Sequence, residues 1–211
     1  MKKDLTEIVF IIDCSGSMSG FEADTVGGFN STVNAQRSKE GDALVTAYLF
    51  SNDSRLLYDR VSLECIAPMA VRDFVACGCT ALYDAVGEAI CHISNIHKYA
   101  RADDVPEHTV FVITTDGMEN ASHKYSHSDI RKMIEEKRRA CGWEFVFLAA
   151  NIDVEENARK IGIAPERAIS FTQSSEGIGE CYHVMCDAIT TARSRKKPDD
   201  ASWRRSSGGK K

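Results

Sequence analysis

The chain has 211 residues, of which 43% are apolar and 27% charged, enough for one compact α/β domain with a sizeable core. It contains no run of eighteen apolar residues, which argues against a membrane span. The net charge is −5, but eight basic and two acidic side chains from Arg193 onward contribute +6. The preceding residues therefore carry −11, which argues against a nucleic-acid-binding face.

Strand and helix signals alternate along the chain, the pattern of a largely parallel sheet covered by helices. Apolar, β-branched runs predict strands, and apolar residues three or four positions apart predict helices. The expected strands are 6–12, 43–50, 55–61, 109–115, 144–150 and 168–171. The expected helices are 19–36, one that opens at residue 80, 128–140, one that starts at 153 and stops at 162, and 176–193.

Turn residues refine this pattern. Asn52 and Asp53 form a tight turn between two strand signals, so we expect the second of them to be an antiparallel edge strand. Gly27 and Gly28 interrupt a predicted helix at a cost of about 1 kcal/mol each relative to alanine, which close packing on the sheet would offset. Gly142 is placed to end a later helix.

Five oxygen-bearing side chains stand out. Asp13, Ser15 and Ser17 follow the first strand, Thr80 opens a helix, and Asp116 follows a later buried strand. Ligands of open α/β sheets collect beyond the carboxyl ends of such strands. The two serines alternate along an extended loop, so their hydroxyls can point into one pocket. Carboxylates and hydroxyls suit Mg²⁺, Mn²⁺ or Ca²⁺ better than Zn²⁺, so we predict a divalent-cation site.

With Asp13-Cys14-Ser15-Gly16-Ser17, Thr80 and Thr115-Asp116-Gly117 in this order, the chain resembles a von Willebrand factor type A domain from about residue 6 to 193. The resemblance implies a Rossmann-like, doubly wound sheet of six mostly parallel strands, with one antiparallel edge strand and helices on both faces. It also implies a metal-ion-dependent adhesion site. In that site Ser15, Ser17 and Thr80 contact the metal, and Asp13 and Asp116 hold it directly or through water.

The charge of this site indicates its function. Two carboxylates neutralise a divalent cation and three hydroxyls add no charge, so the metal retains an affinity for an anionic ligand. We therefore expect a protein partner that supplies a Glu or Asp to the metal, no nucleic-acid or membrane partner, and no enzymatic activity. No oligomeric state is indicated.

Local segments refine the resemblance. Residues 16–20, 27–30 and 80–85 look like those of small, single-domain bacterial cytosolic members, some relatives of which accompany tellurite-resistance and stress-response systems. The N-terminal residues lack the long apolar region of a secretory signal, which favours a cytoplasmic location. We expect the von Willebrand domain to span 1–193. The basic, Ser- and Gly-containing segment 194–211 is expected to be a disordered tail.

Four other residues lie near the motifs, and two of them have two interpretations each. We expect Glu119 and Asn120 at the rim of the site. Asp84 either orients a hydroxyl or a bound water, or complements the helix dipole in the first turn. Asn30 either supports the site or has a simple helix-packing or surface role.

The eight cysteines have irregular spacing, which does not indicate a disulfide framework. Cys14 and Cys79 stand beside the motif and would make its rim sensitive to oxidation or to soft metals. Four others lie among apolar residues and are interpreted as small buried hydrophobes of a reducing cytosol: Cys65, Cys91, Cys181 and Cys186.

Two alternatives compete with the binding module. Asp13 after the first strand resembles the nucleophile of haloacid-dehalogenase-like, Mg²⁺-dependent phosphatases, but Ser15 stands where their general acid would be. His123 and His127, with Glu119 upstream, would form a zinc set if their segment were helical, although its composition favours a polar loop. The segment 16–20 lacks the glycine spacing and lysine of nucleotide-binding loops, and no Gly-x-Ser-x-Gly elbow is present.

Overall fold

Six strands form one sheet in the order β3-β2-β1-β4-β5-β6. The computed structural model describes residues 1–194. The strands are β1 (Lys2–Asp13), β2 (Asp42–Phe50), β3 (Ser54–Ser62), β4 (Pro106–Thr115), β5 (Glu144–Ala149) and β6 (Ala168–Ser170). Every neighbouring pair is parallel except β2 and β3, which are antiparallel, so β3 is the antiparallel edge strand that the sequence predicted.

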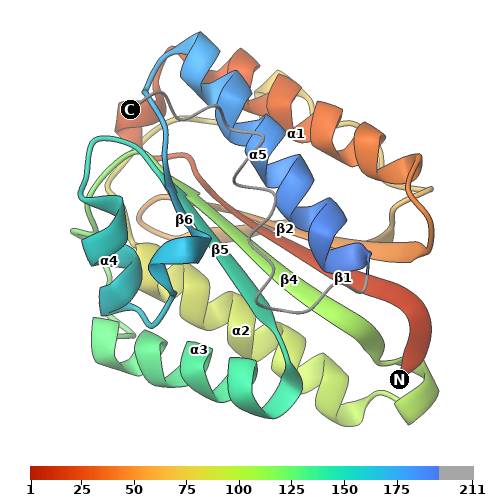
Figure 1. Ribbon diagram of the computed structural model, residues 1–211. Coiled ribbons are helices and arrows are strands. Elements are labelled where there is room, and N and C mark those ends of the chain that lie inside the picture. Colours follow the sequence, from red (N-terminus) through yellow and green to blue (C-terminus); the bar gives the residue numbers. More distant parts are fainter. Residues whose placement is uncertain (195–211) are drawn as a thin grey trace.

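Helices cover both faces of the sheet, which confirms the predicted fold class (Figure 1). They are α1 (Glu22–Arg37), α2 (Leu82–Tyr99), α3 (His127–Cys141), α4 (Val154–Lys160) and α5 (Ser175–Arg193). α1 and α5 form one layer, and α2, α3 and α4 form the other. Among residues 1–194, no helix is long and apolar enough to cross a membrane.

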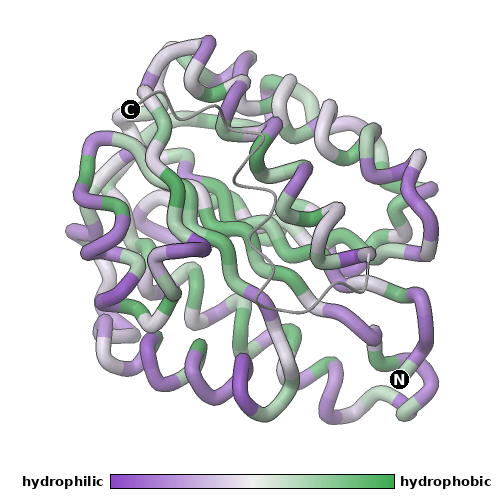
Figure 2. The backbone as a smooth tube through the Cα atoms, viewed as in Figure 1, coloured by the Kyte–Doolittle hydropathy of each residue, from purple (hydrophilic) through white to green (hydrophobic). Residues whose placement is uncertain are grey.

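The core lies on both sides of the sheet. In β1, Ile8, Phe10 and Ile12 face α1 and α5, whereas Val9 and Ile11 face α2. Strands buried on both faces are apolar at successive positions, which explains the continuous runs in the sequence. Figure 2 shows these apolar strands in the middle of the molecule, with hydrophilic positions along the outer sides of the helices.

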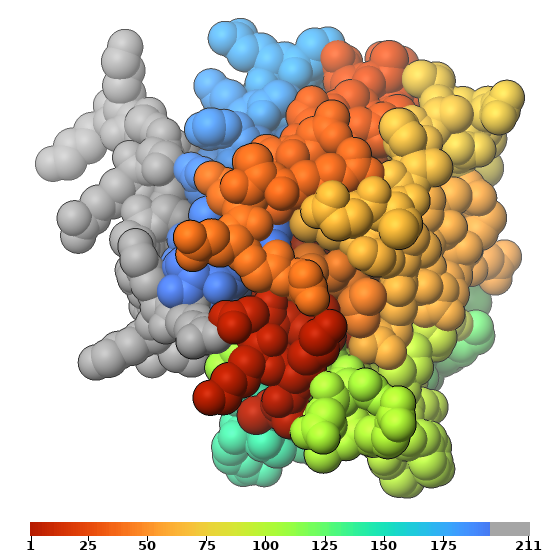
Figure 3. All heavy atoms as spheres, turned by 90° about the vertical axis from the view of Figure 1, so that its right-hand side faces the viewer, coloured from red at the N-terminus to blue at the C-terminus, as the bar shows by residue number. Residues whose placement is uncertain are grey.

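Element ends differ from prediction by a few residues. β1 begins at Lys2 rather than at residue 6, because the Lys2 N–H donates to Val105 O and extends the pairing with the segment before β4. The Lys2 ammonium also pairs with Asp42 at 3.1 Å. Figure 3 views this amino-terminal edge of the sheet, where the start of β1 (red) lies beside the start of β2 (orange). α1 begins at Glu22 rather than at 19, because residues 16–18 form a 3₁₀ turn.

The glycine pair of α1 corrects one expectation. A Cβ on Gly28 would lie 2.3 Å from Cδ2 of Tyr182 in α5, so Gly28 permits close contact between two helices. A Cβ on Gly27 would have no such neighbour within 4 Å. The prediction that both glycines pack on the sheet is therefore wrong.

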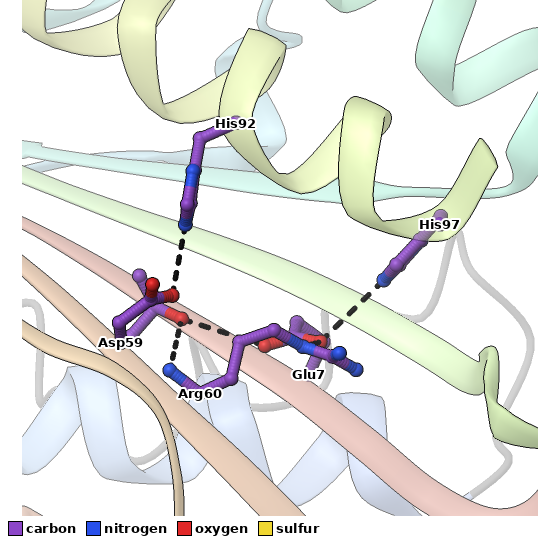
Figure 4. Close-up of polar contacts among 6 residues, drawn as sticks. Glu7, Asp59, Arg60, His92 and His97 are labelled. Atoms are coloured by element: carbon purple, nitrogen blue, oxygen red, sulfur yellow. Dashed lines mark hydrogen bonds and ion pairs between the residues drawn. The ribbon is translucent and has the colours of Figure 1, made fainter. Parts of the chain in front are cut away.

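A buried charge cluster joins β1, β3 and α2 (Figure 4). Glu7 of β1 is fully buried, and its Oε2 accepts from Arg60 Nε at 2.8 Å and lies 3.4 Å from His97 Nε2. Arg60 has a φ of 49°, in a stretch of β3 where the register with β2 shifts. Alongside, His92 of α2 contacts Asp59 at 2.8 Å. These contacts hold the edge strand to the helix that covers it.

The cysteines are all free thiols. Cys181 is buried as predicted, and Cys91 and Cys186 are half-buried. Cys65 is exposed, so its prediction as a buried hydrophobe is wrong. Its N–H donates to Ser62 O in the turn that follows β3, and a turn places its side chain at the surface.

The C-terminal end of the predicted domain is well anchored. Arg193, the last residue of α5, donates from Nη1 to Gln36 O at 2.7 Å and from Nη2 to Gly41 O at 2.6 Å. The predicted basic tail, 194–211, lies outside the described residues except for Ser194.

Candidate metal centre

The candidate site lies where the direction of the strand order reverses. β1 and β4 are neighbours at the middle of the sheet, and the chain leads from β1 toward β2 on one side and from β4 toward β5 on the other. Diverging connections leave a crevice at the carboxyl ends of the two central strands. Asp13 is the last residue of β1, and Asp116 follows the last residue of β4, so both acids lie at this crevice.

Asp13 is 1% exposed and accepts two hydrogen bonds. Thr115 Oγ1 donates to its Oδ2 at 2.6 Å, and the Ser15 N–H donates to its Oδ1 at 2.7 Å. Burial raises the pKa of Asp13, these hydrogen bonds oppose the rise, and the negative charge of Asp116 adds to it. Burial is the largest of these causes and the charge of Asp116 is the smallest.

Asp116 is 2% exposed and is tied to the two predicted serines. Ser17 Oγ donates to Asp116 Oδ1 at 2.7 Å, and the hydroxyls of Ser15 and Ser17 lie 3.1 Å apart. Burial raises the pKa of Asp116, although hydrogen bonds from Ser17 and Ser15 act in the opposite direction. Ser15 is buried and Ser17 is exposed, so this network runs from the interior to the surface.

Thr80 joins the same group from the segment before α2. Its N–H donates to Asn120 Oδ1 at 2.9 Å, and the Asn120 N–H donates to Thr80 O at 3.1 Å. Asn120 thus positions Thr80. A Cβ on Gly117 would lie 3.7 Å from Thr80 Oγ1 and 4.0 Å from Ser17 Oγ, so both hydroxyls face the residue that follows Asp116. The structure therefore brings all five predicted side chains together.

The chemistry of this group fits a hard cation. All five side chains offer oxygen. Within residues 1–194, neither Asp13 nor Asp116 forms an ion pair with a basic side chain. Buried carboxylates are ordinarily paired or coordinate a metal, so the residues of this site fit a cation from outside the chain.

Two residues of the site were missed by the sequence prediction. Gln173 Nε2 donates to Asp116 Oδ2 at 2.6 Å and to Ser17 O at 2.8 Å. Asn151 Nδ2 donates to Gln173 Oε1 at 2.6 Å and to Asp116 O at 3.2 Å. Asn151 follows β5 and Gln173 follows β6, so each lies beyond the carboxyl end of a strand. That position was the available signal.

Asp84 lies in the first turn of α2, as predicted, but its carboxylate does not face a ligand hydroxyl. It accepts from the backbone N–H groups of His123, Lys124 and Tyr125, each at 2.9 Å. Burial by itself would raise the pKa of Asp84, but the three backbone hydrogen bonds and the charge of Lys124 outweigh it and lower that pKa. Asp84 therefore anchors the loop between Asp116 and α3.

Glu119 and Asn30 also have local structural roles. Glu119 Oε2 accepts from the Tyr83 N–H at 2.9 Å and from Ser122 Oγ at 2.7 Å, so this predicted rim residue caps the start of α2. Asn30 donates to Met69 O at 2.9 Å and accepts from the Met69 N–H at 2.8 Å, which secures the loop after β3.

The structure does not support the alternative of a zinc site at His123 and His127. His127 begins α3 and His123 lies in the preceding loop, so the two do not share a helical face. In the part of the chain that the structure describes, no three His, Cys, Asp or Glu side chains are placed to hold a metal ion together.

The cysteines beside the motif differ in accessibility. Cys79 is exposed, whereas Cys14 is buried and its Sγ donates to Phe50 O at 3.2 Å. Burial, followed by the charge of Asp13, raises the pKa of Cys14 to about 11. Of the two predicted rim thiols, Cys79 alone is on the surface.

A large surface cavity lies elsewhere. It has a volume of about 620 Å³ and lies at the amino-terminal end of β5, where Arg138, Trp143 and Arg167 line it. The candidate metal centre is at the carboxyl ends of the strands, so this cavity is not part of it.

Known structures share this fold. The von Willebrand factor domain of the type V pili tip protein Mfa5 from Porphyromonas gingivalis aligns with a TM-score of 0.61 and 10% identity over 91% of this chain and 97% of that chain. Proximal thread matrix protein 1 of the mussel byssus, with a zinc-occupied metal-ion-dependent adhesion motif, aligns with a TM-score of 0.59 and 15% identity over 88% and 46%. Von Willebrand factor type A from Catenulispora acidiphila aligns with a TM-score of 0.58 and 16% identity over 86% and 41%.

These similarities define the class of fold. The six strands and five helices form an α/β domain with the von Willebrand factor type A fold. The chain spans less than half the length of the mussel and Catenulispora chains. No family model and no curated protein matches the sequence.

Proposed function

We propose that Asp13, Ser15, Ser17, Thr80 and Asp116 bind one divalent cation, and that this cation binds a Glu or Asp carboxylate of a partner protein. The observation that carries the proposal is the convergence of two buried carboxylates with three hydroxyl-bearing residues at the crevice between β1 and β4. Among residues 1–194, neither carboxylate forms an ion pair with a basic side chain. The oxygen-only set favours Mg²⁺, with Mn²⁺ or Ca²⁺ as alternatives.

The charges of the ligand set explain why a partner's carboxylate would bind. A bound divalent cation supplies positive charge at the surface of the crevice. Asp13 and Asp116 together carry two negative charges, and Ser15, Ser17 and Thr80 are neutral. The two carboxylates balance the charge of the cation, but negative groups do not surround it. An additional anionic ligand can therefore still bind to it. Ser17, which is exposed, marks the side from which this ligand approaches.

The same geometry disfavours the phosphatase alternative. Both oxygens of Asp13 accept hydrogen bonds, and the side chain is 1% exposed, so it does not face a substrate as a nucleophile must. Ser15 offers a hydroxyl, which does not serve as a general acid near neutral pH. We therefore propose a binding module without catalytic activity. Hydrolysis of an aryl phosphate that is lost in Asp13→Asn would contradict it.

Similar structures support the metal and the binding role. The mussel protein has been solved with zinc in its motif, so this fold accommodates a divalent ion there. The domain from Porphyromonas gingivalis belongs to a pilus tip protein. A cytoplasmic location, a bacterial source and a link to stress response remain predictions from the sequence resemblance.

Affinity capture tests the function. The chain is immobilised and exposed to a native extract in millimolar Mg²⁺, in EDTA, and as the Asp116→Asn variant in Mg²⁺. We expect a captured protein that is absent in EDTA and with the variant, and that stops binding when one of its own acidic residues is substituted. Asp104→Asn, at the opposite edge of the sheet, should capture the same protein as the wild type. An identical captured set under all conditions would refute the metal-bridged mechanism.

A further inference from the structure

The amide of Gln173 contacts two residues of the candidate metal centre, Asp116 and Ser17. This half-buried side chain comes from the segment between β6 and α5. β6 is an edge strand of the sheet, and β4 and β5 separate it from β1. Gln173 Nε2 donates to Asp116 Oδ2 and to Ser17 O at 2.6 and 2.8 Å. It therefore joins two of the proposed ligand-bearing loops to a third segment.

The orientation of this amide is chemically determined. Nε2 meets a carboxylate oxygen and a backbone carbonyl, both of which only accept. Oε1 accepts from Asn151 Nδ2, which itself donates to Asp116 O. A flipped amide would place oxygen against oxygen on one side and nitrogen against nitrogen on the other. Asn151 has a φ of 58°, a left-handed conformation that asparagine tolerates better than most residues.

The amide separates the roles of the two oxygens of Asp116. Oδ1 accepts from Ser17 and lies beside the hydroxyls, whereas Oδ2 accepts from Gln173. A carboxylate with one oxygen held cannot rotate freely about its Cβ–Cγ bond. The other oxygen is therefore kept toward Ser15, Ser17 and the position proposed for the cation.

The chemical type of the side chain also matters. A lysine or arginine at position 173 would neutralise Asp116 and compete with a cation, and a glutamate would repel it. An amide donates a hydrogen bond and adds no charge, so the two carboxylates keep their full negative charge for a metal.

We propose that Gln173 is a positioning residue of the metal centre, which holds Asp116 in its binding orientation and is itself held by Asn151. This rests on the proposed function. Residues that orient a metal ligand typically change metal affinity about 10- to 100-fold when they are removed. A purely structural contact would change stability and leave affinity unaltered.

A Mn²⁺ titration followed by electron paramagnetic resonance, with Mg²⁺ as competitor, tests the proposal. Gln173→Met keeps most of the side-chain length and removes the donor. We expect its dissociation constant for Mn²⁺ to rise about 10-fold. An unchanged or tighter constant would overturn the proposal, and tighter binding would show that Gln173 competes with the metal. Unfolding in EDTA establishes that the variant is folded, and Asn34→Ala, on the exposed side of α1, should bind Mn²⁺ like the wild type.

The role of Asn151 is tested through coupling. Asn151→Gly keeps the positive φ and removes the amide, and we expect weaker Mn²⁺ binding than in the wild type. If Asn151 acts through Gln173, the double variant should bind Mn²⁺ about as well as Gln173→Met alone. Fully additive losses would contradict this coupling.

Asp116→Asn separates this proposal from the proposed function. If Asp116→Asn abolishes Mn²⁺ binding and Gln173→Met leaves Mn²⁺ binding unchanged, the metal centre is supported and the positioning role of Gln173 is refuted. If Asp116→Asn binds Mn²⁺ as well as the wild type, the metal centre is wrong and the role of Gln173 falls with it.

Discussion

Ser17 Oγ donates a 2.7 Å hydrogen bond to Asp116 Oδ1, which joins two residues 99 positions apart in the chain. Each residue lies just beyond the carboxyl end of a central strand, and β1 and β4 are neighbours with the order reversing between them. The sheet topology therefore places the two halves of the motif against each other. It concentrates two negative charges in a buried crevice that no basic side chain among residues 1–194 neutralises.

The burial of Asp116 should affect the stability of the metal-free protein. The pKa of Asp116 is raised above its ordinary value of 3.8, so the folded state favours the protonated acid. The associated stability is present below 3.8 and is lost as pH rises through the raised pKa. In EDTA, Asp116→Asn should therefore gain stability relative to the wild type as the pH rises from 4 to 7. Urea unfolding at several pH values measures the difference.

Mg²⁺ should reverse that order. At a concentration 100 times the dissociation constant, a ligand that binds only the folded state stabilises it by about 2.7 kcal/mol. At pH 7 the wild type should gain this amount and Asp116→Asn should not. Equal gains in both proteins would show that the ion binds somewhere else.

The adjacent glycines of α1 provide a matched pair. Gly28→Ala should destabilise the protein by about 1–3 kcal/mol, because the new methyl group would overlap the ring of Tyr182. Gly27→Ala should stabilise it by about 0.5–1 kcal/mol, because the site is open and alanine favours a helix. Thermal unfolding of the two variants in one buffer checks both signs. Equal effects would contradict the helix–helix contact.

The buried Glu7 should matter more than a surface ion pair. Glu7→Gln removes a fully buried charge that pairs with Arg60, and removal of one partner of a buried pair costs about 3–5 kcal/mol. Arg60 is 21% exposed and can be partly hydrated, so the lower end of this range is expected. Asp104→Asn breaks the exposed pair with Arg101 and should change the unfolding free energy little. Neither substitution should alter metal binding, since both lie away from the crevice.

Asp84 should control the order of the loop between Asp116 and α3. Asp84→Asn places an amide nitrogen against backbone donors, and each buried group left without a partner costs about 1–3 kcal/mol. The amides of residues 123–125 should then exchange hydrogen faster, which mass spectrometry detects. Glu88→Gln removes an ion pair with Lys124 in the same loop, and its exchange should stay close to that of the wild type.

The pH dependence of this anchor has the opposite sign to that of Asp116. The pKa of Asp84 is lowered, so its contribution is present above 3.8 and is lost as pH falls through the lowered value. Slower exchange of these amides in acid than at neutral pH, after correction for intrinsic rates, would contradict the anchoring role.

The sequence predicted the elements well where a pattern was long and periodic. β4 and α5 carry extended apolar patterns, and their predicted ends lie within a few residues of the observed ones. The five candidate ligands could be selected from the sequence because each follows a strand signal or opens a helix, and parallel strands bring such positions to one end of the sheet. Their convergence could be inferred from topology without side-chain detail.

Contacts between distant elements were not predictable in the same way. Nothing local indicates that Gly28 meets Tyr182 or that Asp84 accepts from a loop about 40 residues later, because these contacts depend on how helices and loops pack. The position of Gln173 after β6 was a signal, but the sequence does not show that its side chain contacts Asp116. Gln173 belongs to no motif, and its role depends on the position of β6 relative to β4.

Equilibrium dialysis against Mn²⁺, with the bound metal measured by atomic emission, tests the metal centre most directly. The wild-type chain should retain one ion per molecule, displaceable by excess Mg²⁺, and the Asp13→Asn/Asp116→Asn double variant should retain none while remaining folded in EDTA. A folded wild-type protein that retains no ion, or a double variant that retains as much as the wild type, would contradict the account.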